Sequence, residues 1–336
     1  MTNCTNGFRG FAIAALLTAG VVSTIASGGG GDGSDGTIVP PAGGGVGPTL
    51  ALTAANAPTV SSTMIAAISM TFDIGDITGS GLPIQSGSIP LVISAPMDVG
   101  NSQIVLAAAE APGIGDCVNG GTVDTTATLA DPNTLTVGDR IIGVFDNCDD
   151  NDGYVISGTV DLTVSGYEGN FLTDVFLLGF DVTLVDVVIE EGGESVTTSG
   201  SFTLTLDNLD FPIMGLNLAG SELQLNADGE AISLTNFDHD LTVNIGVFPE
   251  TVVALASGTL EIQSVGGTIG YETIVALEAV GDLDPNKGEI LITGAGSSIR
   301  ILVVDTQNVT LEIDVNGDGV VDEYVYTNWS ELIGDM

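Results

Sequence analysis

An alternation of apolar and polar residues, running from about residue 136 almost to the C-terminus, constrains the fold more than any other feature. From Tyr154 to Val164 the even positions are mostly apolar, whereas the odd positions between them are mostly Ser, Thr or Asp. The alternation recurs over residues 202–206 and 309–313. Successive side chains of a strand point to opposite faces, so a period of two indicates a half-buried strand. These segments therefore predict strands with one face in a core.

The strands follow one another without a helical crossover, which indicates antiparallel pairing. We expect about ten strands, often of roughly 10 to 15 residues. The apolar phase slips between Leu218 and Leu223 and between Leu234 and Phe237, and such a slip marks a bulge that lets a sheet curl. The sequence therefore predicts an all-β fold with a long-stranded, strongly curled antiparallel sheet, either a half-barrel or a sandwich.

Two further features bear on this sheet. Residues 171–189 are apolar on both parities and predict a central strand covered on two faces. An outer-membrane barrel is the alternative architecture, but it needs aromatic girdles, and 11 Phe, 5 Tyr and 1 Trp are spread thinly along the chain.

One segment, near residues 57–70, predicts a helix. Val60, Met64 and Ile68 recur at four-residue spacing after Asn56-Ala57-Pro58, where Asn can cap a helix and Pro suits its first turn. The opposite positions are Ser and Thr, which are only mildly polar, so we expect the helix to be covered on more than one side. A curled sheet needs a filler, and we expect this helix to pack on its concave face.

The first 27 residues have the composition of an export signal. They contain no acid and one basic residue, Arg9, followed by an apolar run from Phe11 to Ala26. The run of about 16 residues is shorter than the ~20 that a membrane span needs, and Thr24 and Ala26 suit a signal peptidase. We predict that residues 1–27 are a signal peptide, with an uncleaved anchor as the alternative. The protein would then be exported to the periplasm, the outer envelope surface or the extracellular space.

The residues after this leader indicate a linker and then one domain. Gly28 stands where a bacterial lipoprotein would carry its lipidated Cys, so we expect no lipid. Residues 28–50 are rich in Gly, Asp and Pro and predict a disordered linker, because they cannot bury enough apolar surface to offset their ordering entropy. Residues 51–336 would form a single β-rich domain.

The cysteines predict a disulfide. With Cys4 in the leader, only Cys117 and Cys148 remain, and an even count in an exported chain favours one bond between them. Metal binding by these cysteines is less favoured, because no CxxC spacing occurs and the only His, His239, lies far along the chain.

The charge excludes several classes of partner. Lys and Arg number 4 against 44 Asp and Glu, a formal net charge of -40. A nucleic-acid binder must neutralise phosphates, and an anionic membrane would repel this chain. We therefore expect no nucleic-acid partner and no transmembrane domain once the signal is removed. Another envelope protein or a hydrophobic ligand stays open as a partner.

A calcium-like motif lies near the C-terminus, between two predicted strands. Oxygen-bearing residues at loop positions 1, 3, 5 and 9 with Gly at position 6 match the calcium loop of EF-hands, and the loop is also similar to those of dockerins and thrombospondin type 3 repeats. By that match three side chains would bind directly, the carbonyl of residue 320 would bind, and residue 322 would bind directly or through water. Position 12 is Val325 instead of Glu, so a neighbouring Glu is the replacement. The predicted ligands are Asp314, Asn316, Asp318, Val320, Asp322 and Glu323.

Two interpretations of this motif stay open. Asn316-Gly317 and Asp318-Gly319 are also hairpin turn dipeptides. A hairpin does not need four crowded carboxylates, which repel one another without a cation. We therefore favour Ca²⁺ as the cofactor, at a weak affinity of about 10⁻⁴ to 10⁻³ M.

Signals for catalysis are few. His239 lies on the apolar parity of its strand, which predicts a hydrogen-bonded core residue instead of a base. No Gly-x-Ser-x-Gly occurs, and Trp329 is the only Trp, whereas sugar clefts usually carry several. Asn328 and Glu331 predict a short capped helix at Trp329. Residues 146–153 carry half of a calcium loop, but Cys148 stands at its first ligand position, so a polar turn is the simpler interpretation.

Five features of the chain together resemble uncharacterised exported β-rich envelope proteins of Gram-negative bacteria. They are the leader, the Gly- and Asp-rich linker, the segment Phe145-Asp146-Asn147-Cys148, the long alternating strands and the Asp-rich end. The resemblance implies an envelope location and brings no activity with it. We therefore expect an exported, disulfide-linked, calcium-stabilised structural or interaction protein. The alternative is a carrier that binds a lipid-like ligand in the concave face of its sheet.

Overall fold

The computed structural model describes residues 47–80, 113–117, 119–130, 135–149, 154–170, 175–191, 194–227, 229–281 and 283–333. The predicted signal peptide and most of the predicted linker lie outside these residues.

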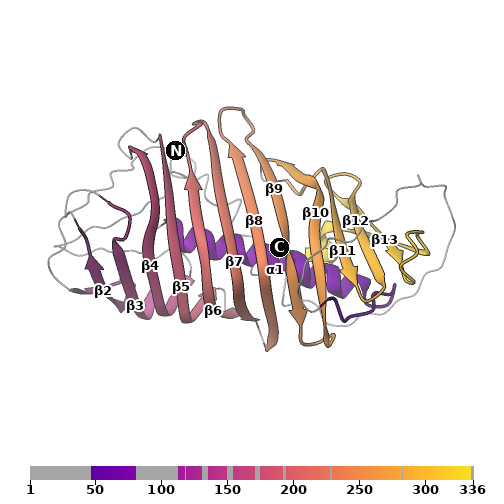
Figure 1. The fold of residues 1–336 in the computed structure, drawn as a ribbon, viewed down its shortest axis with the longest axis horizontal. Helices are drawn as coiled ribbons and strands as arrows, with labels where there is room; N and C mark the ends of the chain where they lie inside the picture. The colour runs from indigo at the N-terminus through magenta and orange to yellow at the C-terminus, as the bar shows by residue number, and fades with distance from the viewer. Residues whose placement is uncertain are drawn as a thin grey trace.

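The described strands form one antiparallel sheet of 14 strands in chain order, and the sheet is not closed (Figure 1). Its strands are β1 Gly113–Asp116, β2 Gly120–Thr128, β3 Arg140–Asp149, β4 Tyr154–Asn170, β5 Val175–Glu191, β6 Glu194–Asp207, β7 Ile213–Ala227, β8 Glu230–Asn244, β9 Thr251–Ile262, β10 Gly267–Val280, β11 Lys287–Gly294, β12 Ser297–Val303, β13 Asn308–Asp314 and β14 Glu323–Asn328. The all-β antiparallel prediction is confirmed. The sandwich alternative is not, because these strands share a single sheet.

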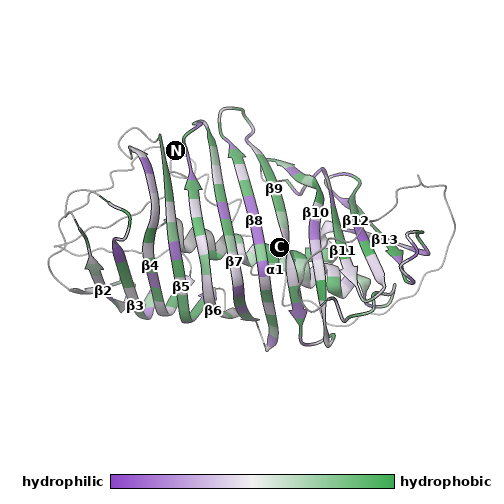
Figure 2. Ribbon diagram, viewed as in Figure 1, coloured by the Kyte–Doolittle hydropathy of each residue, from purple (hydrophilic) through white to green (hydrophobic). Residues whose placement is uncertain are grey.

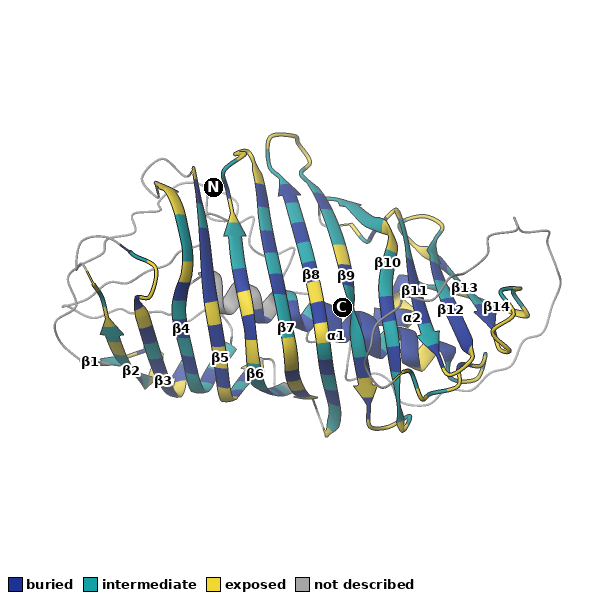
Figure 3. Cartoon of the chain, viewed as in Figure 1, coloured by how far each residue is buried: buried dark blue, intermediate teal, exposed yellow. Residues whose placement is uncertain are grey.

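The alternation of the sequence becomes an alternation of burial. Apolar and polar residues follow one another along the strands (Figure 2), and buried and exposed residues do the same (Figure 3). In β8 every second residue from Ile232 to Leu234, and then from Phe237 to Val243, is buried. One face of the sheet therefore carries the core, and residues of the other face are partly or fully exposed.

Both predicted phase slips are bulges. The pairing of β7 with β6 shifts between Ser201 and Phe202, and the pairing of β8 with β9 shifts between Thr235 and Asp238. Asn236, inside the second shift, has a φ of 49°, in the left-handed region. An extra residue in one strand moves the apolar set to the other parity, so burial stays on the same face of the sheet.

The prediction of a strand covered on two faces is wrong. In β5, Phe176, Leu178 and Phe180 are buried, whereas Asp181 and Thr183 between the later buried positions are exposed. Of the apolar residues between the buried positions, Val185 is half exposed and Leu177 is partly exposed. Isolated apolar residues are common on protein surfaces, so periodicity could not separate this case from true double burial.

The helix α1, Ala57–Ser80, is longer than the predicted 57–70. Phe72 and Ile74 continue its apolar pattern and contact the core, which supports the extra turns. Asn56 does not cap the helix with its side chain. Its Oδ1 accepts from the backbone N–H of Thr53, and its Nδ2 donates to the carbonyl of Ala51.

Helix α1 runs across the strands, as Figure 1 shows. It contacts β6, β7, β8, β9 and β13. Its 24 residues span about 36 Å, which matches the ~34 Å between β6 and β13 at a strand spacing of about 4.8 Å. Even Ser61 and Thr71 are fully buried, so the helix lies within the core and is not an amphipathic surface helix.

A second helix, α2 Trp329–Ile333, follows β14 and contacts α1. The backbone N–H of Glu331 donates to Asn328 Oδ1 at 2.8 Å, as expected of the predicted cap. Neither described helix is long and apolar enough to span a membrane.

Candidate functional site

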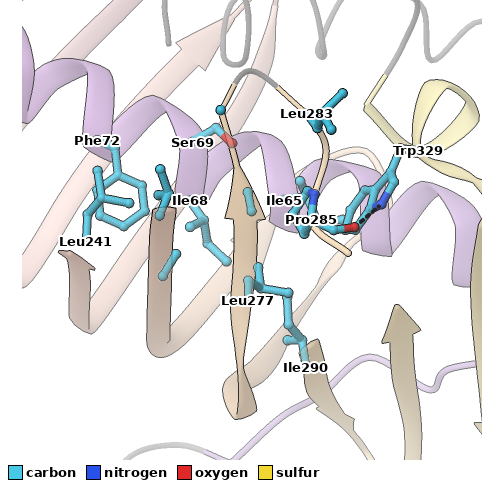
Figure 4. A pocket seen from close by; sticks show the side chains of 14 residues that line it. Ile65, Ile68, Ser69, Phe72, Leu241, Leu277, Leu283, Pro285, Ile290 and Trp329 are labelled. Carbon is cyan, nitrogen blue, oxygen red and sulfur yellow. Dashed lines mark hydrogen bonds between the residues drawn. The ribbon is translucent and has the colours of Figure 1, made fainter. Parts of the chain in front are cut away.

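A cavity of about 120 Å³ lies where α1 crosses the later strands (Figure 4). Its walls come from α1, from β8 to β11, from the loop between β10 and β11, and from α2. The lining residues are Ile65, Ile68, Ser69, Phe72, Leu241, Val252, Ala254, Leu277, Ala279, Gly281, Leu283, Pro285, Ile290 and Trp329.

The periodicity of the helix and of the strands directs these side chains toward the same cavity. The α1 residues stand at positions i, i+3, i+4 and i+7, which share one helix face. Val252 and Ala254, two residues apart on β9, share one sheet face. Trp329 closes the wall, since its Nε1 donates to the carbonyl of Pro285 at 3.1 Å and fixes the indole (Figure 4).

The chemistry of the cavity is apolar. Among the described residues that line it, Ser69 carries the only polar side-chain atom besides the bonded indole nitrogen of Trp329, and none is charged. An apolar cavity of about 150 Å³ can bind benzene, whereas drug-sized ligands occupy about 300–1,000 Å³. The space therefore suits one ring or a short alkyl segment. Leu283 lines the cavity and is 58% exposed, so the apolar wall reaches the surface there.

Next to the cavity, a buried hydrogen-bond chain joins α1 to the sheet. Thr71 Oγ1 lies 2.5 Å from His239 Nδ1, and His239 Nε2 lies 2.8 Å from the hydroxyl of Tyr271. Thr71 donates its hydroxyl hydrogen to the carbonyl of Ile68, so its oxygen must accept from Nδ1–H. Nε2 is then the acceptor for Tyr271. The predicted hydrogen-bonded core histidine is what the structure contains.

Burial sets the charge state of this chain. It lowers the pKa of His239 to about 3 and raises the pKa of Tyr271. Both groups are therefore neutral near pH 7. A neutral imidazole with both nitrogens engaged joins α1 to β8 and β10 and offers no free nitrogen for proton transfer.

The calcium-like loop, residues 314–323, connects β13 to β14. Asp314, 3% exposed, accepts through Oδ1 from the backbone N–H of Gly317 at 2.7 Å and through Oδ2 from that of Gly319 at 2.8 Å. Asn316 Oδ1 and Asp318 Oδ1 each accept from the backbone N–H two residues later. These side chains fold the loop around themselves.

The remaining candidate ligands lie around the same loop. Asp322 Oδ2 accepts from the backbone N–H of Val315 at 3.0 Å. Val320 is exposed, and Glu323 begins β14 opposite Ile313. Within the described residues, no three His, Cys, Asp or Glu side chains form a group that could hold a metal ion. The structure thus brings the Asp and Asn side chains into one hydrogen-bonded turn. Calcium binding by this turn stays a prediction.

Cys117 and Cys148 form the expected disulfide, with Cα atoms 5.4 Å apart. It joins the residue after β1 to β3 at the start of the sheet. Of the second acidic cluster, residues 146–153, the last four lie outside the described residues. In its described part Asp149 Oδ1 accepts from Asn119 Nδ2 at 3.3 Å, a contact of an ordinary polar turn.

Comparison with protein-family models, with curated proteins and with solved structures found no match to this chain.

Sequence reasoning missed the cavity. Its walls come from six separate elements, and each residue individually carries only a core signal. The one local hint was Trp329, a large side chain isolated at the end of the chain.

Proposed function

We propose that this protein is an exported, disulfide-linked interaction module of the cell envelope or extracellular space, stabilised by Ca²⁺ and without catalysis. Its sheet curls around α1, and α1 fills the concave face. The observation that carries this proposal is the burial of α1, in which even Ser61 and Thr71 are inaccessible to solvent. A sheet whose face is occupied by its own helix leaves little room for cargo, and the outer surface is then what meets a partner.

Calcium binding is supported by the organisation of the 314–323 loop. A side-chain oxygen has two lone pairs, so an oxygen that accepts from one backbone N–H group keeps capacity for a cation. Asp314 Oδ2, Asn316 Oδ1 and Asp318 Oδ1 each accept from one backbone N–H group, which holds three oxygen-bearing side chains on one short turn. In a chain of net charge -40, a divalent cation also relieves the repulsion between neighbouring carboxylates.

The calcium proposal is tested by thermal unfolding with chelator and with millimolar Ca²⁺. A ligand that binds only the folded state stabilises it by ~1.4 kcal/mol at about ten times Kd, so Ca²⁺ should raise the melting temperature. Asp318→Ala should abolish this increase.

Asp305→Ala is the matched control. Asp305 accepts from the backbone N–H groups of Gln307 and Asn308 in the turn after β12, without a calcium motif. It should lower stability equally with and without Ca²⁺. An unchanged melting temperature in the wild-type protein, together with no heat of binding in calorimetry, means that the motif is only a turn.

A carrier is the second candidate, because the apolar cavity has room for one ring or the end of an alkyl chain. Its 120 Å³ is less than the several hundred Å³ that a whole lipid-like ligand needs. Calorimetric titration with a small apolar probe, toluene, separates the two. Saturable binding that is lost in the cavity-filling variant Ala254→Leu supports the carrier, whereas no binding supports the module.

A further inference from the structure

Three neighbouring loops carry exposed apolar residues at one end of the sheet. The described residues of these loops are 208–212, 245–250, 281 and 283–286, at the end where β7 and β9 begin and β8 and β10 finish. Phe248 is 98% exposed, and Leu283 is more than half exposed. We call the following residues the apolar loop cluster: Phe211, Ile213, Val247, Phe248 and Leu283.

Hydrogen bonds show that these loops lie side by side. The backbone N–H of Ile245 donates to the carbonyl of Pro212 at 3.1 Å, which joins the first two loops. The backbone N–H of Gly281 donates to the carbonyl of Glu250 at 2.8 Å, which joins the second and third. The exposed apolar residues therefore belong to one region of the surface, which is typical of an interaction site.

Charge decides which partner fits this region. Two copies of a chain of net charge -40 repel each other, as does an anionic lipid surface. In sequence the loops carry four acidic residues and no basic residue, and Lys287 just beyond them is paired with Glu278. The acidic residues are Asp210, Glu250, Asp282 and Asp284. A suitable partner has no net negative charge, presents positive groups on its outside and has an apolar layer underneath them.

We propose that the apolar loop cluster docks the protein on a bilayer of zwitterionic lipids. Phe211, Val247 and Phe248 enter the boundary between headgroups and acyl chains, where aromatic side chains are favoured. The flanking carboxylates face the ammonium groups of the headgroups. This inference rests on the proposed interaction module and names its partner.

The cluster also continues into the cavity. Leu283 belongs to both, because it lines the cavity and is exposed at its edge. A docked molecule would therefore place the cavity beside the acyl chains, and a cavity that suits a short alkyl segment could receive the end of one chain.

Flotation with phosphatidylcholine vesicles tests the proposal, using protein purified from the exported fraction of expressing cells. Phe248→Ser should weaken partitioning about tenfold, because it removes most of the transfer free energy of one aromatic side chain. Phe248 is almost fully exposed, so this change should leave the melting temperature unaltered. Tyr326→Ser on β14 is the matched control, since Tyr326 is also an exposed aromatic residue, 68% accessible, and should bind as the wild-type protein does.

Three results would overturn the docking proposal. The first is a wild-type protein that does not float, and the second is equal loss in both variants. The third is sedimentation showing an oligomer that Phe248→Ser dissociates, which would make the cluster a self-interface. Vesicles with added phosphatidylglycerol should bind less, and stronger binding there would contradict the charge argument. Calcium stabilisation is measured on the same proteins, so the docking proposal can fail while the calcium-stabilised module stands.

Discussion

At the scale of single residues, His239 shows how burial turns a reactive side chain into a structural one. Its two nitrogens are bonded to Thr71 and Tyr271, and its ring lies 5.8 Å from that of Phe72, centroid to centroid. Because α1 supplies Thr71 and Phe72, the histidine is a polar contact between the helix and the sheet inside a mostly apolar core. A polar group in such a place stabilises the fold only while it is neutral and fully bonded.

Acidification should therefore weaken the fold through His239. Its pKa is about 3 when folded and about 6.5 when unfolded, so the unfolded state binds the additional proton. This contribution is complete above pH 6.5 and is lost as the pH falls toward 3, at up to ~1.4 kcal/mol per pH unit. Urea unfolding at pH 7.0 and pH 5.5 measures it.

His239→Gln supplies the comparison for that measurement. The variant should be less stable at pH 7, because Thr71 and Tyr271 lose an ideal partner, but its stability should depend less on pH over this interval. Titrating carboxylates contribute equally to both proteins. If the stability of both proteins depends on pH in the same way, the pKa of His239 is not lowered in the folded state, and the prediction is contradicted.

At the scale of elements, α1 contacts parts of the sheet that lie far apart. It touches strands as far apart as β6 and β13 and reaches α2, so it connects segments of the sheet that do not pair with one another. Helical propensity explains little of this, since the helix contains many Ser, Thr and Ile residues. Its stability comes from burial, because between Val60 and Thr71 every residue except Ser62 and Ser69 is buried.

Ile68→Asp should destabilise the protein by several kcal/mol, because it places an unpaired charge in the core beside the cavity. Thr59→Asp is the control, since Thr59 is exposed in the first turn of the same helix, where an acid is favoured by the helix dipole. Thermal unfolding should show a large decrease for the first change and little or none for the second. Equal stability of both variants would mean that α1 does not belong to the core.

At the scale of the whole molecule, an open sheet of 14 strands depends on one covered face. The other face carries Thr, Ser, Asn and Asp between the apolar residues, and the net charge of -40 disfavours close approach of two copies. The disulfide strengthens the β1–β3 end of the sheet, where the chain enters it. The apolar loop cluster is a departure from this pattern, and for that reason we place the interaction surface there.

The sequence by itself predicted antiparallel pairing, the two bulges in β7 and β8, the cysteine pair and the burial of His239. It predicted about ten of the strands, whereas the described sheet has 14, and it gave no strand signal for β1 and β2. Each of these predictions follows from local periodicity or from counting residues, because the alternation of a strand can be seen directly in consecutive residues. The full length of α1 was only partly readable, since its polar face of Ser and Thr is buried too.

The tertiary structure alone decided which elements meet. It united the strands in one sheet instead of a sandwich, exposed one face of β5, and assembled the cavity from six elements. It also set the three apolar loops side by side. Such contacts join residues far apart in the chain, and their free energy comes from burial that no segment achieves alone. Composition and periodicity therefore do not predict them.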